Sequence, residues 1–378
     1  MKKSTKILWA VSLLVLLALI LFGVQRWAAS RDSSSEEMLG VLLHDMPGDT
    51  SGIVYVDVTQ LRRSPFAQKL FAWAPKPQAD PEYTRFVAQT GFNYEHDLDR
   101  VAFSAATRGS QPVWFAIADG TFDQKKIAAY MADIGVVQKR GGHDIYSIPA
   151  SLPTNVPGNA LANGTAPSAS PQISFTFLRP GRIAATNDAD LSVYLNQKKP
   201  IADPVQWQTR FIRLAGSPLF IVVRQNASTA NSLAAQAPGG FQSPQLSALL
   251  GELTWLTFAA QPQDDSLRIV AEGESPSDTS ARQLADMLDG AVILAQAGLN
   301  DPKMRQQLNP EARTAYLELL KSADITRLDR EELKAVRVVF EITANFLKAA
   351  TLPKPTPAAP QPASNSNAAA KPAHTGHK

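Results

Sequence analysis

The chain has 378 residues, of which 44% are hydrophobic, and it contains no cysteine. The absence of cysteine excludes a disulfide scaffold, a thiolate nucleophile and a zinc–cysteine site. The formal net charge of +3 belongs to the two ends of the chain, because residues 38–351 carry 29 Lys/Arg against 31 Asp/Glu. This body therefore lacks the basic charge that is typical of a nucleic-acid-binding protein, and we expect no nucleic-acid partner.

The first predicted element is an apolar run from Ile7 to Val24, which is broken only by Ser12. A helix of this length is about as long as the hydrocarbon core of a bilayer is thick. Lysines at positions 2, 3 and 6 precede the run, and this predicts a cytoplasmic N-terminus with an extracytoplasmic or periplasmic body. The run exceeds the apolar part of most cleavable signal peptides. We therefore expect a retained single-pass anchor in the inner (cytoplasmic) membrane, with cleavage after Ser30 as the alternative.

Composition divides the chain into five parts. Two segments, 150–172 and 352–378, are rich in Pro, Ala, Ser and Asn, and such segments cannot bury a core, so we predict disorder for both. The predicted parts are a cytoplasmic stub and transmembrane anchor (1–28), a juxtamembrane linker (29–44), a first α+β repeat (45–200), a second α+β repeat (201–351) and a tail (352–378).

Within the first repeat, hydrophobic periodicity predicts the element order β-α-β-β-α-β-β-β-α. Ser64 and Pro65 mark a helix start, and Gly135 marks the end of a second helix. We expect Asp188 to cap the last helix, which ends near Leu195. The predicted elements are strands at 53–58, 101–105, 113–117, 143–148, 173–177 and 183–186, with helices at 64–73, 122–134 and near 188–195.

The second repeat follows a similar order, and one stretch matches the first repeat directly. Leu253–Ala260 aligns with Leu98–Ala105 at a constant offset of 155 residues, which pairs Phe103 with Phe258. We predict an α+β fold in which an N-terminal transmembrane helix precedes two tandem β-α-β-β-α-type repeats with mainly antiparallel sheets. The further predicted elements are strands at 219–223, 253–260, 267–272, 325–328 and 336–342, and helices beginning at Ser228, spanning 284–291 and 310–322, and capped by Thr343.

Catalytic motifs are missing from the sequence, which has no P-loop, GxGxxG, GxSxG or HExxH pattern. Its densest polar cluster, Tyr94–Arg100, could bind a metal through its acids and His96. The favoured interpretation is a solvated loop whose acids pair locally with Arg100. His44 and His143 are expected on the surface, and the histidines at 374 and 377 fall in the predicted tail. We predict no catalytic, cofactor-binding or metal-binding residue and no cofactor.

Three tryptophans, Trp114, Trp207 and Trp255, could line a ligand groove. Trp114 lies between Val113 and Phe115 within a predicted strand, and packing into the core or onto a sheet surface is the more common role of such aromatic side chains. We therefore interpret all three as packing residues.

Three tracts carry a family resemblance: Gly52–Asp57, Thr90–Val101 and Phe115–Ile117. Through them the chain resembles an uncharacterised bacterial domain-of-unknown-function family of N-terminally anchored, two-repeat α+β envelope proteins. The resemblance covers parts of the body only. It implies an envelope location and supplies no activity or site residue.

These features favour a non-enzymatic, membrane-anchored envelope protein that binds or scaffolds another envelope component. The bilayer is its predicted partner through Ile7 to Val24, and a further envelope protein or an apolar ligand could occupy the body. A lipid or lipoprotein carrier is the first alternative, because curved sheets can enclose apolar ligands. A hydrolase that uses Glu95 to Asp99 is the second.

Overall fold

The computed structural model describes residues 45–73, 81–108, 111–149, 172–188, 190–195, 201–214, 216–225, 248, 250–331 and 333–350. The predicted anchor Ile7–Val24, residues 150–171 of the predicted loop, the start of the predicted helix at Ser228, His44 and the predicted tail lie outside these residues. Among the described residues, no helix is both long and apolar enough to span a bilayer.

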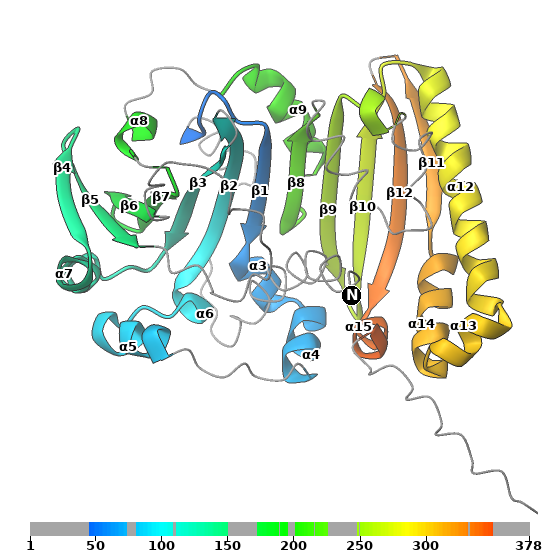
Figure 1. Cartoon of the computed structure of the whole chain (residues 1–378), viewed down its shortest axis with the longest axis horizontal. Coiled ribbons are helices and arrows are strands. Elements are labelled where there is room, and N and C mark those ends of the chain that lie inside the picture. The colour runs from blue at the N-terminus through cyan, green and yellow to red at the C-terminus, as the bar shows by residue number, and fades with distance from the viewer. Residues whose placement is uncertain are drawn as a thin grey trace, which may run out of the picture.

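The described chain forms a mixed α+β structure around one sheet of twelve strands (Figure 1). Every recorded strand pair is antiparallel, and the strand order is β11-β12-β10-β9-β8-β1-β2-β3-β7-β6-β5-β4. The strands are β1 (Gly52–Asp57), β2 (Leu98–Arg108), β3 (Gln111–Gly120), β4 (Val136–Arg140), β5 (His143–Pro149), β6 (Gln172–Arg179), β7 (Arg182–Thr186), β8 (Leu219–Arg224), β9 (Trp255–Gln263), β10 (Ser266–Glu274), β11 (Asp324–Arg330) and β12 (Leu333–Thr343).

Helices connect and cover the strands of this sheet. Several begin at side chains that accept a hydrogen bond from the first turn, including Asp123, Ser277 and Asn309. The helices are α3 (Val58–Arg63), α4 (Pro65–Trp73), α5 (Pro81–Thr90), α6 (Tyr94–Asp97), α7 (Gln124–Ile134), α8 (Ser192–Leu195), α9 (Pro204–Arg213), α12 (Asp278–Asn300), α13 (Pro302–Gln307), α14 (Pro310–Lys321) and α15 (Ala344–Ala350).

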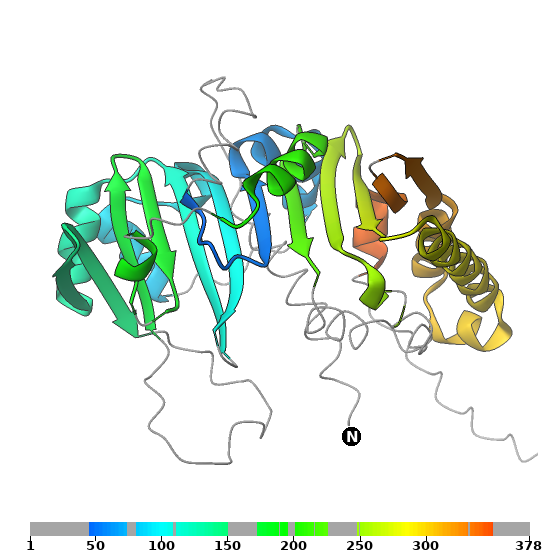
Figure 2. The same cartoon turned by 90° about the horizontal axis from the view of Figure 1, so that it is seen from above.

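The two halves of the chain meet where β1 pairs with β8. This antiparallel ladder places Val54 opposite Ile221 and Tyr55 opposite Phe220. The regions 45–200 and 201–351 therefore share one continuous sheet, which Figure 2 shows from above as a single curved layer. The prediction of an α+β fold with mainly antiparallel strands is confirmed at this level.

The β2–β3 and β9–β10 hairpins have the same register. Phe103 pairs with Ala116 in the first hairpin, and Phe258 pairs with Ala271 in the second. Both residues of the second pair follow their counterparts by the 155 positions found in the sequence. A duplicated unit would produce this agreement, and the duplication itself stays a prediction.

Side chains alternate between the two faces of the sheet, and helices cover both faces. On the first face, which we call the α9 face, Ile53 and Tyr55 are buried in one cluster with Trp207 and Phe211 of α9. On the opposite face, Val56 is buried with residues of α3 and α4, and α12 packs farther along the sheet on Leu253, Leu256 and Val336.

Some predicted boundaries and caps change in the structure. The carboxylate at the start of α8 is that of Asp190, which accepts from the backbone N–H of Ser192 at 2.9 Å, whereas the predicted cap Asp188 instead accepts from the hydroxyl of Tyr194 at 2.8 Å. Thr343 does cap α15, because its hydroxyl accepts from the backbone N–H of Phe346 at 3.0 Å. Helices α3, α5, α6, α9 and α13 and strand β4 have no counterpart among the predicted elements.

Trp207 provides a test of the packing under α9. Its side chain is 0% exposed, and its ring meets that of Trp255 edge-on at 4.9 Å between centroids. We expect Trp207→Ala to lower the free energy of unfolding by about 3–5 kcal/mol, because it leaves a large cavity. Val205→Ala, at a position 71% exposed on the same helix, should change it by less than about 0.5 kcal/mol. Equal effects in urea unfolding would contradict the burial of this helix face.

Candidate functional site

Acidic side chains of the Tyr94–Arg100 cluster make hydrogen bonds that fix the local structure. The carboxylate of Asp97 accepts from the backbone N–H of Asn93 at 2.8 Å, and that of Asp99 accepts from the hydroxyl of Thr59 at 3.1 Å. These bonds fix α6 and connect the beginning of β2 to α3. Among the described residues, no group of three or more histidine, aspartate and glutamate side chains could hold a metal ion.

Arg62 completes this region from α3. Its guanidinium donates to the backbone carbonyl of His96 at 2.6 Å and also to that of Leu98. Burial lowers the pKa of Arg62 from its ordinary value. The predicted pairing of Arg100 within the cluster is wrong, because Arg100 instead lies 3.5 Å from Asp57 at the end of β1, and the predicted loop is largely the helix α6.

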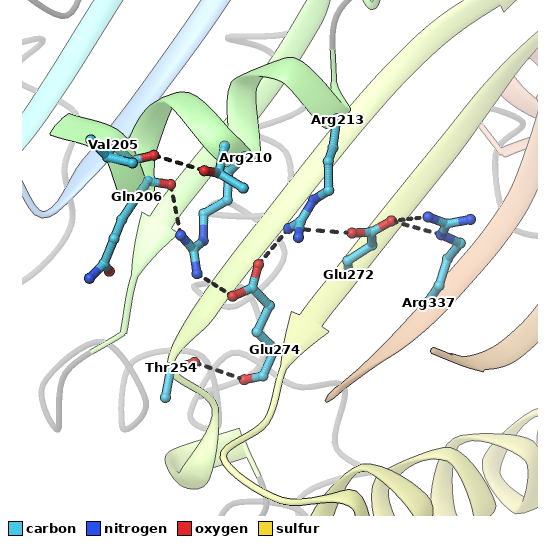
Figure 3. Close-up of polar contacts among 9 residues, drawn as sticks. Val205, Gln206, Arg210, Arg213, Thr254, Glu272, Glu274 and Arg337 are labelled. Carbon is cyan, nitrogen blue, oxygen red and sulfur yellow. Dashed lines mark hydrogen bonds and ion pairs between the residues drawn. The ribbon is translucent and has the colours of Figure 1, made fainter. Parts of the chain in front are cut away.

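The most deeply buried carboxylates of the described chain lie on β10. Glu272 and Glu274 are 4% and 6% exposed, and they project onto the same face of the sheet because they are two residues apart in a strand. Arg210 and Arg213, three residues apart on α9, reach toward them (Figure 3). Figure 3 also shows Arg337 of β12 approaching from the other side. We call these five residues the arginine–glutamate cluster.

The contacts in the arginine–glutamate cluster form a chain across three elements. Arg210 and Arg213 donate to the two carboxylate oxygens of Glu274. Arg213 also lies 3.7 Å from Oε2 of Glu272, and Arg337 donates to Oε1 of Glu272 through Nε at 2.7 Å. Three guanidinium groups thus surround two carboxylates, and the cluster connects α9 to β10 and β12.

The environment of Arg210 shows what this cluster can do chemically. Its guanidinium lies over the ring of Trp255, 3.9 Å from the centroid, where a cation is attracted to the aromatic face. Burial lowers the pKa of Arg210, and the charge of Glu274 opposes this effect. The cluster contains no hydroxyl or imidazole, so nothing in it resembles a nucleophile with its base. Its geometry is that of a clamp between a helix and a sheet.

The three tryptophans considered as possible ligand contacts lie in different environments. Trp207 and Trp255 belong to the core of the α9 face. Trp114 is half-buried on β3, and its ring lies 5.0 Å from that of Phe103 on β2. His143 is half-buried at the start of β5.

Sequence reasoning missed the arginine–glutamate cluster. The strand predicted at 267–272 contains one of the two glutamates, and a strand glutamate commonly faces solvent. The spacing of Arg210 and Arg213 places both on one side of a helix, but α9 itself was not predicted. Even with that helix, no sequence signal pairs residues about 60 positions apart.

Comparison with known proteins gives structural matches only. No protein-family model matches the chain, and no curated protein matches it. The chain is similar to the structure of crystal form III of TP0453, with a TM-score of 0.41, 10% identity, and coverage of 85% of this chain and 99% of that chain. For crystal form I of TP0453 the values are 0.39, 11%, 85% and 96%.

Because the arginine–glutamate cluster connects α9 to the sheet, we expect the loss of one of its carboxylates to lower the free energy of unfolding strongly. We expect Glu274→Ala to lower the free energy of unfolding by about 3 kcal/mol, because the partly buried guanidinium groups of Arg210 and Arg213 lose this partner. The measurement is urea unfolding followed by tryptophan fluorescence and circular dichroism.

A matched control is the surface pair of Lys69 and Asp265, whose side chains are 54% and 73% exposed. Asp265→Ala should cost less than about 1 kcal/mol. If Glu274→Ala were as mild as this control, the cluster would not hold α9 on the sheet.

Tyr83 predicts how the region around α6 responds to alkaline pH. Its hydroxyl donates to Oδ1 of Asn93 at 3.1 Å. Burial raises the pKa of Tyr83 to about 12, and the charges of Glu95 and Asp97 add to the rise. Because the folded state favours the neutral phenol, its stabilising effect is complete below the unfolded pKa of about 10. It is then lost as the pH rises toward 12.

We therefore expect Tyr83→Phe to lose less stability than the natural chain between pH 10 and pH 12. Urea midpoints measured across this range provide the test, with Tyr316→Phe as the control. Identical pH profiles for the natural chain and Tyr83→Phe would contradict the raised pKa.

Proposed function

We propose that this protein is a membrane-anchored envelope protein whose extracytoplasmic body binds or scaffolds another envelope component without catalysing a reaction. The observation that carries the proposal is the apolar run Ile7–Val24 with its preceding lysines. An apolar helix of this length is stable in a bilayer, and the cations before it favour a cytoplasmic N-terminus.

The length of the linker supports a body that works close to the bilayer. Residues 25–44, which follow the apolar run and include the predicted linker 29–44, would span at most about 70 Å if fully extended. The next residue is Asp45, whose carboxylate accepts from Nη1 of Arg182 at 3.0 Å. Arg182 is itself bound by both carboxylate oxygens of Asp119, at 2.6 and 2.9 Å. The linker would therefore connect the anchor to Asp45, which its contact with Arg182 holds on the sheet.

The pairing of buried acids with arginines in the body favours binding over catalysis. Its buried acids and arginines pair with each other in the arginine–glutamate cluster and at Arg182. A carboxylate held between guanidinium groups fixes the geometry of the fold and is poorly suited to act as a base in proton transfer. A large sheet with fixed helices offers a partner a rigid surface.

The absence of cysteine permits a direct test of topology. We expect Asp265→Cys, in the body, to react in spheroplasts with a thiol reagent that cannot cross the inner membrane. Ser4→Cys, before the anchor, should react only after detergent is added. Fractionation of the same cells should recover the full-length chain with the membranes.

Two results would contradict the proposal in different ways. Protection of Asp265→Cys in intact spheroplasts would place the body in the cytoplasm. A soluble product without its first thirty residues would instead show that the apolar run is a cleaved signal peptide.

A further inference from the structure

Strand β4 forms one edge of the sheet and, among the described residues, pairs with β5 alone (Figure 1). All five of its residues are exposed. They include two valines, Val136 and Val137, which are 57% and 43% exposed. A strand with a neighbour on one side presents unpaired backbone groups on the other, and such a row is a template for a further strand.

The contacts of β5 determine which backbone groups of β4 point outward. The carbonyl of Asp144 on β5 faces β6, because it accepts from the hydroxyl of Thr176 at 2.8 Å. Backbone groups alternate in direction along a strand, so Asp144 does not exchange hydrogen bonds with Lys139, which lies opposite it on β4. The N–H and C=O groups of Lys139 and Val137 therefore point away from the sheet. Within the described chain, no hydrogen bond of these groups is recorded.

The side chains of β4 divide between the two faces of the sheet. Val137 lies opposite Tyr146, which is buried against α7, so Val137 and Lys139 lie on the face that α7 covers. Val136 and Arg140 lie on the α9 face, where Arg140 is 3.2 Å from Asp190. No ion pair of Lys139 is recorded among the described residues. The outward groups of β4 are thus accompanied by a cation on one face and an exposed valine on the other.

The opposite edge of the sheet, β11, is protected. Arg327 of β11 lies 3.1 Å from Asp278 at the start of α12, and Ile325 packs against the cluster that α12 buries. Charges of both signs follow one another along β11, since it also contains Asp324 and Asp329. Mixed charge and a covering helix discourage pairing at an edge. Strand β4 carries charge of one sign only, so it would select a strand of matching chemistry.

We propose that β4 is a docking edge for an extended segment of another envelope protein, in which acidic residues alternate with β-branched apolar residues. The segment continues the sheet as one more strand. Its acidic residues lie opposite Val137 and Lys139 and exchange backbone hydrogen bonds with them. Its apolar residues lie on the α9 face beside Val136. This docking edge rests on the proposed function and gives that function a surface and a kind of partner.

Charge favours such a segment over a second copy of β4. The strand contains Lys139 and Arg140 and no acid. Two copies side by side would bring the cations of both strands together, and like charges across a strand pair are destabilising. An acidic segment instead provides Lys139 with a partner of opposite sign.

Binding of a labelled peptide to the full-length chain in detergent tests strand addition. The probe is a short fluorescein-labelled peptide of alternating valine and glutamate, and fluorescence anisotropy measures its binding. We expect saturable binding that is at least about tenfold tighter than that of the peptide with lysine in place of glutamate. Absence of saturable binding would refute the docking edge.

N-methylation of the peptide separates backbone pairing from attraction between side chains. Methylation of the glutamate amides should abolish binding, because these N–H groups face β4. Methylation of the valine amides, which face away from β4, should change the affinity by less than about threefold. Equal affinities of the two methylated peptides would overturn the strand addition, and neither peptide alters the fold of the protein.

Variants of β4 locate the binding. Val137→Pro removes one outward N–H group and leaves the bonds to β5 in place, so it should weaken binding by about tenfold or more, whereas Val137→Ala should weaken it by about threefold or less. Lys139→Glu should weaken binding by about fivefold or more. Lys321→Glu makes the same change in net charge at an exposed position at the end of α14 and should have little effect.

Equal weakening by Lys139→Glu and Lys321→Glu would show that the peptide is attracted by the overall charge, and this would refute the docking edge. Urea unfolding of each variant checks that the fold is kept. Peptide binding to the purified chain does not depend on membrane topology. A failure here would therefore leave the thiol-labelling test of the proposed function undecided by this result and still to be read on its own.

Discussion

The antiparallel ladder between β1 and β8 is the interaction on which the rest of the structure depends. It is the point at which the two halves of the chain become one sheet. The side chains at this ladder are buried on the α9 face, where Tyr55 and Phe220 stack at 4.9 Å between ring centroids. Without this pairing, two apolar strands would become open edges, and open edges recruit other strands. The ladder therefore joins the two regions, and one core cluster contains residues from both.

Helix α9 secures this arrangement because it immediately precedes β8 and lies over the same face. One side of the helix buries Trp207 and Phe211, while Arg210 and Arg213 extend toward the carboxylates of β10. Burial of apolar side chains stabilises the packing of α9 but does not fix the orientation of the helix, because the hydrophobic effect is non-directional. A guanidinium–carboxylate contact contributes less stability but constrains orientation. The arginine–glutamate cluster therefore sets where the helix lies on the sheet.

The limits of sequence reasoning follow from the same physics. The β2–β3, β9–β10 and β11–β12 hairpins were predictable, because alternation along a strand is a local signal. Helix α9 was missed although Pro204 begins it and Trp207, Phe211 and Leu214 follow at helical spacing, which is a recognisable helix pattern. Strand β4 is exposed throughout and gives no alternation. Arg337 pairs with Glu272 of β10, which is the neighbouring strand in the sheet but lies 65 residues away in the sequence. Such pairs depend on topology, which composition and periodicity leave open.

The contacts that hold the fold together occupy much of the centre of the sheet. Helix α9 and the clamp cover the α9 face near the β1–β8 ladder, and α3 and α4 cover part of the opposite face. Glu272, Glu274 and Arg182 are each paired with a group of opposite sign. A partner protein could enter this region only by breaking contacts that hold the fold together. At one end of the sheet, Ile293 and Leu294 of α12 are 65% and 72% exposed, so a partner could contact them without breaking any of the contacts described above.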